Sequence, residues 1–454
     1  MTRVAVVGGG LAGLAASLSC ADAGADVVLL ESRPRLGGAT WSFTLRGRSY
    51  DNGQHVFLRC CTAYRSFLDR LGVDGHVRLQ PRLDIPVLAG SVPGAGRVRL
   101  RRSPRLPAPL HLAPALARYR HVPFAQRARL LPAVVALRGV DPRAASSDEQ
   151  TFGHWLAAHG QGDRAVSALW DLITLPTVNL PASEASLSMA AKVFRTGLLE
   201  RADAADLGWS SVPLGELHGD AAARALADCG AEVRLRQPVA GVLPRPGGVT
   251  VRLESGEAVE ADAAVVAVPH DGAAALLPAG TLEHQDELAA LGTSPIVNVA
   301  VVLDRAVTDD PVFAVLDSPL QWVFDHTDAS GAERGQVLVV SMSAATDALG
   351  RPTADLVAEV VAELRRLLPR AARAEVVDAV VSRQGAATFR AAPGAGRLRP
   401  GTSTGHPRLF VAGAWTDTGW PATMEGAVRS GTAAAAGALG AAGVPARVPE
   451  EVPA

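Results

Sequence analysis

The chain has 454 residues, of which 48% are hydrophobic and 20% charged, and its formal net charge at pH 7 is −1. This length allows two or three domains, and this composition is that of an ordinary globular protein. A net charge near zero gives no general reason to expect nucleic acid as a partner. The four cysteines lack CxxC or zinc-ligand spacing, which argues against a disulfide framework and a metal site and fits a reducing cytoplasm.

The N-terminal stretch "TRVAVVGGGLAGLAASLSCADAGADVVLLES" predicts a buried strand, a glycine turn, a helix, and a second strand that ends in an acid. Gly8, Gly10 and Gly13 form the pattern GxGxxG, and Glu31 follows the last of them by eighteen residues. In such a unit the glycines allow a tight turn, close approach of a pyrophosphate and packing of helix on strand, while the acid binds a ribose diol. The spacing therefore predicts a dinucleotide site.

A second glycine turn, "SRPRLGGATWS", follows Glu31 directly and places Arg35, Gly37 and Gly38 close to the same phosphates. No second GxGxxG and no CxxC occur, which excludes a separate NAD domain and a disulfide reductase. Residues 256–269, "GEAVEADAAVVAVP", predict a strand that returns the chain to the nucleotide sheet. A cofactor domain assembled from the beginning, middle and end of the chain points to FAD.

Residues 97–143 contain eleven arginines and one acid, Asp141, in a background of Leu, Ala and Pro. Two interpretations are open: a solvated helical cap, or an interfacial element that rests on anionic lipid. The second interpretation predicts that charge reversal at Arg101 and Arg102 weakens binding to anionic vesicles.

The late stretch "VAGAWTDTGWPATMEGAVRSG" predicts a strand at residues 409–412, a polar turn and a helix that Trp420-Pro421 opens. Proline at a first helical position wastes no hydrogen bond, because its missing N–H would have had no partner there. Residues 416–418 would then lie beside the bare N–H groups of the helix, a place that suits an anion.

These motifs together resemble the flavin amine oxidase and carotenoid desaturase superfamily. More narrowly, "YDNGQHVF" at 50–57, "SPIVNVAVVLDR" at 294–305 and the late "GWPATMEGAVRSG" are similar to bacterial hydroxysqualene dehydroxylases. The resemblance implies an α/β fold in which a Rossmann-like FAD-binding domain is interleaved with an α+β substrate domain and a helical cap.

The resemblance and the strand pattern divide the chain between two discontinuous domains. Within the second, "PTADLVAEVVAELRRLLPRA" predicts an amphipathic helix with Thr353 as its cap. We expect the FAD domain at residues 1–85, 200–270 and 390–445, the substrate and cap domain at 86–199 and 271–389, and a flexible tail at 446–454.

The resemblance also implies where the flavin is held. The late helix would point its N-terminus at the pyrimidine edge of the ring and stabilise the anionic reduced flavin. The superfamily usually has an acid at the position of Ala414, for which Asp417 is the candidate replacement. No cysteine stands near this motif, so FAD is expected to be non-covalent. The expected FAD contacts are Gly8, Gly10, Gly13, Glu31, Arg35, Gly37, Gly38, Gly53, Val239, Gly413, Asp417, Thr423 and Met424.

The substrate strand departs from the amine oxidases. Their lysine near flavin N5 falls at Asn298, and the sole lysine of the chain, Lys192, lies outside this strand. With only three tyrosines no aromatic cage is evident, and a core rich in Leu, Val and Ala suits a long apolar substrate. The resemblance implies that hydroxysqualene, an allylic C30 alcohol, loses its hydroxyl and receives hydride to give squalene.

This reaction needs a proton donor that turns hydroxide into water. The expected catalytic residues are His55, Asp51 and Asp417, of which His55 is favoured because an imidazolium can give a proton near neutral pH. Each has a structural alternative: His55 could orient a loop, Asp51 could hold the Gly53 turn, and Asp417 could contact the ribityl chain. Of the other polar residues, Glu425 is expected to complement the helix dipole, and Asp325 and His326 to form a loop ion pair.

Three functions remain open at this stage. The first is the reductive dehydroxylase of hopanoid biosynthesis, the second an oxidative phytoene-type desaturase, and the third a non-catalytic flavin-binding partner of a squalene-synthesising assembly. The expected partners are an apolar isoprenoid, a membrane surface contacted by 97–143 and squalene-pathway enzymes. The expected location is the cytoplasm, peripherally at the inner face of the cell membrane. Nothing in the sequence resembles a nicotinamide or ferredoxin site for an electron donor.

Overall fold

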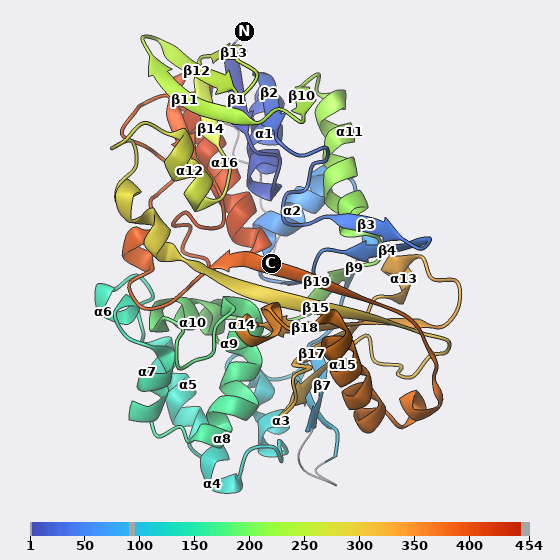
Figure 1. Ribbon diagram of the computed structural model, residues 1–454. Coiled ribbons are helices and arrows are strands. Elements are labelled where there is room, and N and C mark those ends of the chain that lie inside the picture. The colour runs from blue at the N-terminus through green and yellow to red at the C-terminus, as the bar shows by residue number, and fades with distance from the viewer. Residues whose placement is uncertain (1, 90–95, 446–454) are drawn as a thin grey trace.

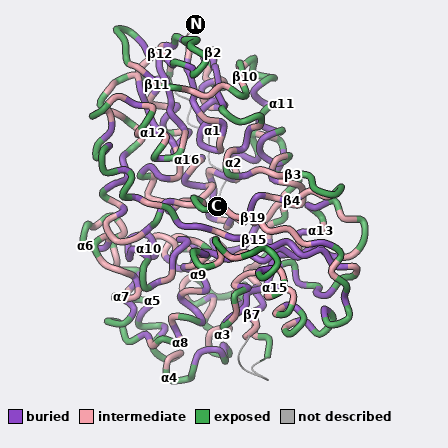
Figure 2. The backbone as a smooth tube through the Cα atoms, in the orientation of Figure 1, coloured by how far each residue is buried: buried purple, intermediate pink, exposed green. Residues whose placement is uncertain are grey.

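The computed structural model describes residues 2–89 and 96–445, so the predicted flexible tail at 446–454 lies outside the described residues. The molecule has an upper lobe, which holds the N-terminus, and a lower lobe, with the long strand pair β15 and β19 crossing between them (Figure 1). Buried residues run through the sheets of both lobes, and exposed ones follow the outer helices and loops (Figure 2).

A five-stranded parallel sheet with the order β10-β2-β1-β14-β20 is the centre of the upper lobe. Its strands come from three distant parts of the chain. Both faces of β1 and β14 are apolar, and they are covered by helices on one side and mainly by a small antiparallel sheet within residues 239–261 on the other. The strands are β1 (Arg3–Val7), β2 (Asp26–Glu31), β10 (Glu232–Leu235), β14 (Ala263–Val266) and β20 (Leu409–Val411).

Helices α1 and α16 pack closely against each other over this sheet (Figure 1). A Cβ at Gly431 would lie 2.0 Å from the carbonyl oxygen of Ala12, so only glycine allows the two backbones to approach so closely. The upper lobe contains α1 (Leu11–Asp22), α2 (Thr62–Arg70), α11 (Ala221–Asp228), α12 (His270–Leu276) and α16 (Met424–Ala441).

Smaller sheets flank the parallel sheet. The predicted strand at 256–269 is in fact two strands in different sheets, because the chain turns at Asp262, whose carboxylate accepts the N–H of Arg3 at 2.8 Å. The small sheets are formed by β3 (Ser42–Leu45) with β4 (Arg48–Asp51), by β5 (Val56–Leu58), β9 (Leu207–Ser210) and β6 (Val77–Leu79), and by β11 (Val239–Arg245), β12 (Gly248–Leu253) and β13 (Ala258–Ala261).

A seven-stranded mixed sheet with the order β19-β15-β18-β17-β16-β7-β8 forms the lower lobe. Strand β15, second in this order, lies between β19 and β18 and is buried along almost its whole length. The strands are β7 (Asp84–Ala89), β8 (Val98–Arg101), β15 (Thr293–Leu303), β16 (Val312–Leu316), β17 (Trp322–Asp325), β18 (Gln336–Ser343) and β19 (Val376–Phe389).

Helices cover this sheet and form the predicted cap. The amphipathic helix α15 (Thr353–Leu367) is confirmed, but Pro352 and not Thr353 holds its N-cap position. Within the described residues, no helix combines the length and the apolar character needed to cross a bilayer. The cap helices are α3 (Ala113–Ala117), α4 (Phe124–Arg127), α5 (Leu130–Arg138), α6 (Ala145–Asp148), α7 (Phe152–Ala158), α8 (Asp163–Ala165), α9 (Asp171–Val178) and α10 (Leu187–Phe194), and the short α13 (Thr327–Ser330) and α14 (Thr346–Leu349) flank β18.

Candidate functional site

The first glycine turn joins β1 to α1 and is shaped by its neighbours. Gly8 has a φ of +105°, and a Cβ there would lie 2.5 Å from the carbonyl oxygen of Ala267. A Cβ at Gly13 would lie 1.8 Å from the carbonyl oxygen of Gly8. No side chain caps α1, whose N-cap is Gly10, so the N–H groups at its start are left for a bound anion.

The carboxylate of Glu31 lies beside this turn. Its Oε2 accepts the N–H of Gly9 at 2.7 Å, and its Oε1 accepts the N–H of Arg33 at 2.7 Å. Both bonds fix the carboxylate at the end of β2, where a ribose diol can reach its remaining lone pairs. The N–H of Gln237 donates to the carbonyl of Glu31 at 2.9 Å, so the segment that leads to Val239 runs along the same edge.

The second glycine turn packs on the first. Gly37 donates its N–H to the carbonyl of Gly9 at 2.9 Å, and a Cβ at Gly38 would lie 2.6 Å from the Cα of Gly10. The guanidinium of Arg35 lies 3.9 Å from the centre of the Trp41 ring, and partial burial lowers its pKa. The residues predicted to hold the pyrophosphate therefore meet at one place, and their glycine cradle and cation fit a dinucleotide.

The late helix begins later than the sequence predicted. Pro421 lies before α16, and Thr423 is its N-cap, with Oγ1 accepting the N–H of Gly426 at 3.1 Å. The prediction failed because a threonine side chain competes well for the first free N–H groups. Gly413 donates its N–H to Oγ of Ser430 at 2.8 Å, which holds the end of the preceding strand against the helix.

Glu425 has a role that the sequence did not reveal. Its carboxylate is buried and accepts the N–H groups of Ala63 at 3.2 Å and Tyr64 at 2.8 Å, at the start of α2. Nε of Arg429 donates to it at 2.7 Å. Glu425 therefore caps a neighbouring helix 361 residues away in sequence, in addition to standing in the first turn of its own.

Arg399 organises the polar turn before α16, and no sequence motif indicated it. Its guanidinium is buried and donates to the carbonyls of Thr416 at 2.6 Å, Trp420 at 2.7 Å and Trp415 at 3.1 Å. Burial lowers its pKa to about 10. Asp417 lies in the same turn but is exposed, and its carboxylate accepts the N–H of Gly419 at 3.0 Å.

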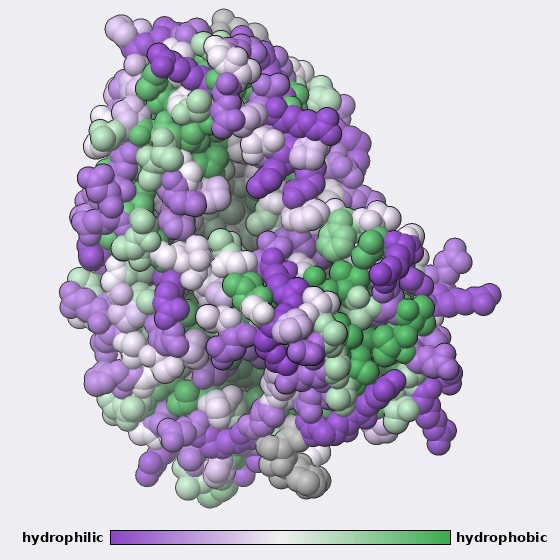
Figure 3. Space-filling model, in the orientation of Figure 1, coloured by the Kyte–Doolittle hydropathy of each residue, from purple (hydrophilic) through white to green (hydrophobic). Residues whose placement is uncertain are grey.

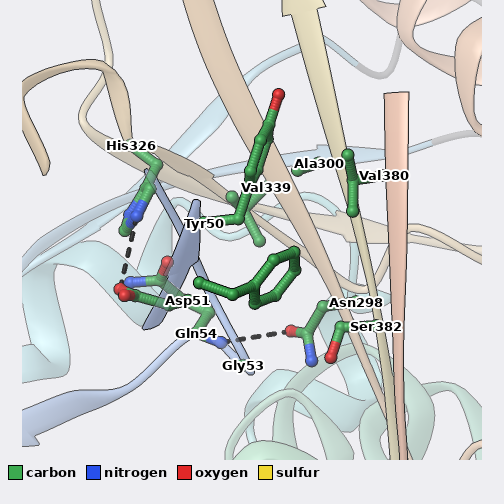
Figure 4. A pocket seen from close by; sticks show the side chains of 11 residues that line it. Tyr50, Asp51, Gly53, Gln54, Asn298, Ala300, His326, Val339, Val380 and Ser382 are labelled. Atoms are coloured by element: carbon green, nitrogen blue, oxygen red, sulfur yellow. Dashed lines mark hydrogen bonds and ion pairs between the residues drawn. The ribbon is translucent and has the colours of Figure 1, made fainter. Parts of the chain in front are cut away.

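A pocket lies between the 51–54 loop and the lower sheet (Figure 4). Nε2 of His326 lies 3.3 Å from Oδ2 of Asp51, within ion-pair distance but outside hydrogen-bond geometry. Both side chains are largely buried, and Oδ1 of Asp51 accepts the N–H of Leu214 at 3.0 Å. The expected pairing of Asp325 with His326 is wrong, because Asp325 accepts hydrogen bonds from Thr327 and Gln336 instead.

Asn298 enters the same pocket from β15 (Figure 4). Its Oδ1 accepts the N–H of Gln54 at 3.3 Å. Its Nδ2 is buried, lies 3.3 Å from where a Cβ on Gly53 would stand, and has no hydrogen-bond partner among residues 2–89 and 96–445. A buried donor without a protein partner suits an acceptor on a bound group.

His55 follows the Gly53 loop, and its Cε1 lies 3.6 Å from where a Cβ on Gly53 would stand. Its Nδ1 is 2.9 Å from the carbonyl oxygen of Gly53, which can only accept, so Nδ1 carries a proton. Burial lowers the pKa of His55. His218 lies nearby, fully buried, with its Nε2 2.7 Å from the hydroxyl of Tyr64, and burial lowers its pKa to about 3.

The sole lysine, Lys192, reaches this region from α10. Its Nζ lies 4.8 Å from the centre of the Trp420 ring, and the guanidinium of Arg429 lies 5.6 Å from the same ring. Burial lowers the pKa of Lys192. Figure 3 shows a hollow in the upper lobe, above the β15 and β19 pair, with hydrophobic residues among those that line it. Lys192 and Arg429 therefore both lie against Trp420, shortly before the start of α16.

Two curated proteins from different branches are similar to this chain over nearly its full length. The hydroxysqualene dehydroxylase of Sinorhizobium fredii is 28% identical over 440 residues, which cover 95% of this chain and 97% of that protein. The zeta-carotene desaturase of Zea mays is 25% identical over 482 residues, which cover 97% of this chain and 84% of that protein.

Solved structures show the same fold. A double mutant of putrescine oxidase superposes with a TM-score of 0.74 at 20% identity, covering 97% of this chain and 99% of that one. An oxidoreductase from Methanosarcina mazei gives a TM-score of 0.74 at 16% identity, covering 95% and 99% of the two chains.

The family model described as flavin containing amine oxidoreductase matches residues 11–439. This match confirms the resemblance, the α/β fold and the FAD cofactor that the motifs predicted, and it establishes the protein as an FAD-dependent oxidoreductase. The chain thus belongs to the flavin-containing amine oxidoreductase family.

Proposed function

We propose that the protein reduces hydroxysqualene to squalene in hopanoid biosynthesis. The observation that carries this proposal is the end-to-end likeness to proteins named hydroxysqualene dehydroxylase, 28% identical over 97% of the lengths of those from Sinorhizobium fredii and Rhodopseudomonas palustris. Asn298 supports it from the site side, because a neutral amide stands where the resemblance places the lysine of amine oxidases. The hollow of the upper lobe, which hydrophobic residues help to line, suits a long isoprenoid.

The reaction breaks one carbon–oxygen bond and forms one carbon–hydrogen bond. Bound FAD in its two-electron reduced form supplies the hydride. The chain must supply one proton to the departing hydroxyl, so that it leaves as water, and must keep other water from the allylic carbon. The free Nδ2–H of Asn298 is placed to hold the oxygen of the alcohol.

We assign the proton to the pair of Asp51 and His326 rather than to His55. In neutral His55 the proton on Nδ1 faces the Gly53 carbonyl, and Nε2 can only accept. Its lowered pKa opposes the imidazolium form that would make it a donor. His326 lines the pocket, with its Nε2 3.3 Å from Oδ2 of the Asp51 carboxylate. Asp417 lies in an exposed turn, so we do not assign the proton to it. Its contact with the flavin stays a prediction.

Co-expression with the synthases that make hydroxysqualene tests the proposal, with the lipids read by mass spectrometry. We expect squalene to replace hydroxysqualene with the wild-type chain. His326→Gln should lower the rate about 100-fold, the usual scale for losing a general acid. His55→Gln should lower it far less, while both variants keep the flavin absorbance spectrum. Equal losses in the two variants would remove the assignment to His326.

A phytoene-type desaturase is the second candidate, and the likeness to the Zea mays zeta-carotene desaturase favours it. This function runs electrons in the opposite direction, from the polyene to oxidised FAD. Incubation of the oxidised protein with phytoene under argon should then bleach the flavin and lengthen the conjugated chain. We expect no bleaching. A non-catalytic flavin-binding partner would bind FAD and show no absorbance change with either substrate.

We also propose that the protein works at the inner face of the cell membrane, because the proposed substrate partitions into lipid. Squalene-pathway enzymes are the proposed neighbours there.

A further inference from the structure

A wide concavity on the lower lobe is lined mainly by arginines. It lies between β8 and the segment that follows α3, and about 1110 Å³ in it is free of protein atoms. The arginines are Arg82, Arg97, Arg99, Arg101, Arg102, Arg118 and Arg120.

Only part of this positive charge is neutralised. Among the described residues, three carboxylates pair with four of the arginines: Asp84 with Arg99 and Arg101, Asp310 with Arg97 and Arg99, and Asp206 with Arg102.

The guanidinium groups of Arg82 and Arg120 make no hydrogen bond or ion pair within the part of the chain that the structure describes. Arg118 donates only to the carbonyl of Pro114, at 3.4 Å in its own turn. These three groups point to an anion outside the chain, and the forked guanidinium matches phosphate oxygens best.

Arg101 and Arg102 are therefore the wrong residues for the predicted vesicle test. Arg102 is 13% exposed and binds the fully buried carboxylate of Asp206 at 2.6 Å, and Arg101 pairs with Asp84. Charge reversal at Arg102 would place two carboxylates together in a buried position and unfold the region.

An apolar surface continues from the concavity along the chain. Phe124 is 79% exposed, and Leu131 and Val135, one turn apart on α5, are 51% and 57% exposed. The opposite face of α5 is already buried in the core through Ala133 and Leu137. The helix thus presents a second apolar face that the described chain does not cover.

The arginines and the exposed apolar side chains belong to one stretch of the lower lobe, from β8 to α5. In Figure 1, α4 lies at the lower end of the molecule, α3 slightly above it, and α5 higher in the same lobe. Nucleic acid would use the arginines but leave Phe124, Leu131 and Val135 in water. An anionic bilayer matches both, because its phosphates suit the guanidinium groups and its acyl boundary takes the apolar ones.

We propose that this surface docks on an anionic phospholipid bilayer, with headgroup phosphate in the arginine concavity and Phe124, Leu131 and Val135 in the acyl boundary. The docking requires neither the active site nor the identity of the substrate. It uses no step of the reaction, so it stands or falls apart from the proposed function.

Vesicle flotation of the full-length holoprotein tests this surface. One set of vesicles is pure phosphatidylcholine and the other contains phosphatidylglycerol. Arg82→Gln with Arg120→Gln removes two free cations, and the matched control is Arg224→Gln with Arg252→Gln, two exposed arginines of the upper lobe. Leu131→Ser with Val135→Ser removes apolar contacts, and its control is Leu235→Ser with Val377→Ser, both exposed elsewhere.

We expect the wild type to float with anionic vesicles only, and 1 M salt to release it. Loss of both free arginines should weaken partitioning about 30-fold, at about fivefold for each cation. The serine pair should weaken it at least tenfold, and neither control should change it. All variants should keep the thermal unfolding midpoint and flavin absorbance of the wild type.

Three results would overturn the proposal. The first is equal flotation with neutral and anionic vesicles, and the second is equal loss of flotation in a variant and its control. The third is tight binding of soluble pyrophosphate, abolished by the arginine variants, without flotation, which would assign the concavity to a free anion.

Discussion

His218 offers a direct test of how the site is packed. The ring is fully buried, and its pKa falls from 6.5 to about 3 in the folded protein. The folded state therefore binds fewer protons than the unfolded state below pH 6.5, so His218 removes stability as the pH falls towards 3. Between pH 8 and pH 5, only the interval of about 1.5 pH units below 6.5 contributes, at about 1.36 kcal/mol for each unit. The free energy of unfolding therefore falls by about 2 kcal/mol.

The test compares wild type with His218→Gln, which keeps a hydrogen-bonding group for the hydroxyl of Tyr64. Urea unfolding with saturating FAD at pH 8 and pH 5 gives the difference in the free energy of unfolding for each protein. This difference should shrink by about 2 kcal/mol in the variant. His154→Gln, a change at an exposed ring, should leave it unchanged. An unchanged difference in His218→Gln would refute the assignment of a buried neutral ring.

Three further substitutions probe the cofactor site. Gly13→Ala places a Cβ 1.8 Å from the carbonyl oxygen of Gly8, so FAD binding should weaken about tenfold or more in a fluorescence titration, and unchanged binding would contradict the glycine cradle. Glu425→Ala strands the N–H groups that it caps and should cost about 3 kcal/mol in urea unfolding, whereas a loss under about 1 kcal/mol would contradict the capping role. Arg399→Leu leaves three buried carbonyls without their donor, so it should lower the unfolding midpoint and release FAD on dilution. A variant with the wild-type midpoint and with FAD still bound would show that Arg399 does not stabilise the turn.

The sequence predicted the nucleotide end of the molecule well, because its constraints are local. A side chain at Gly8 or Gly13 would clash with residues of the same β-α-β unit or of the segment after the neighbouring strand. Glu31 accepts its hydrogen bond from Gly9 in the same unit. The long amphipathic helix was equally accessible, since one apolar face in each turn suffices to predict it.

Contacts between distant parts of the chain escaped prediction. His326 meets Asp51 across 275 positions, and no spacing rule links a residue after β17 to one at the end of β4. Glu425 was expected to serve its own helix, because a carboxylate in a first turn looks the same whether it caps α16 or α2. The sequence predicted that the late helix starts at Pro421, whereas α16 starts at Met424, because Thr423 is the better N-cap.

The charge of the 97–143 stretch shows the same limit. The residue count showed that the stretch is positively charged, but it could not show which acids pair with its arginines. Three carboxylates from outside the stretch neutralise Arg97, Arg99, Arg101 and Arg102. The structure was needed to separate the arginines that hold the fold from those that face outward.

The reaction itself is tested most directly by a single turnover without oxygen. The purified yellow protein is reduced chemically, freed of excess reductant and mixed with hydroxysqualene. We predict that the flavin absorbance returns as one squalene forms for each flavin. A reduced protein that stays bleached, with hydroxysqualene unconsumed, would contradict reductive dehydroxylation.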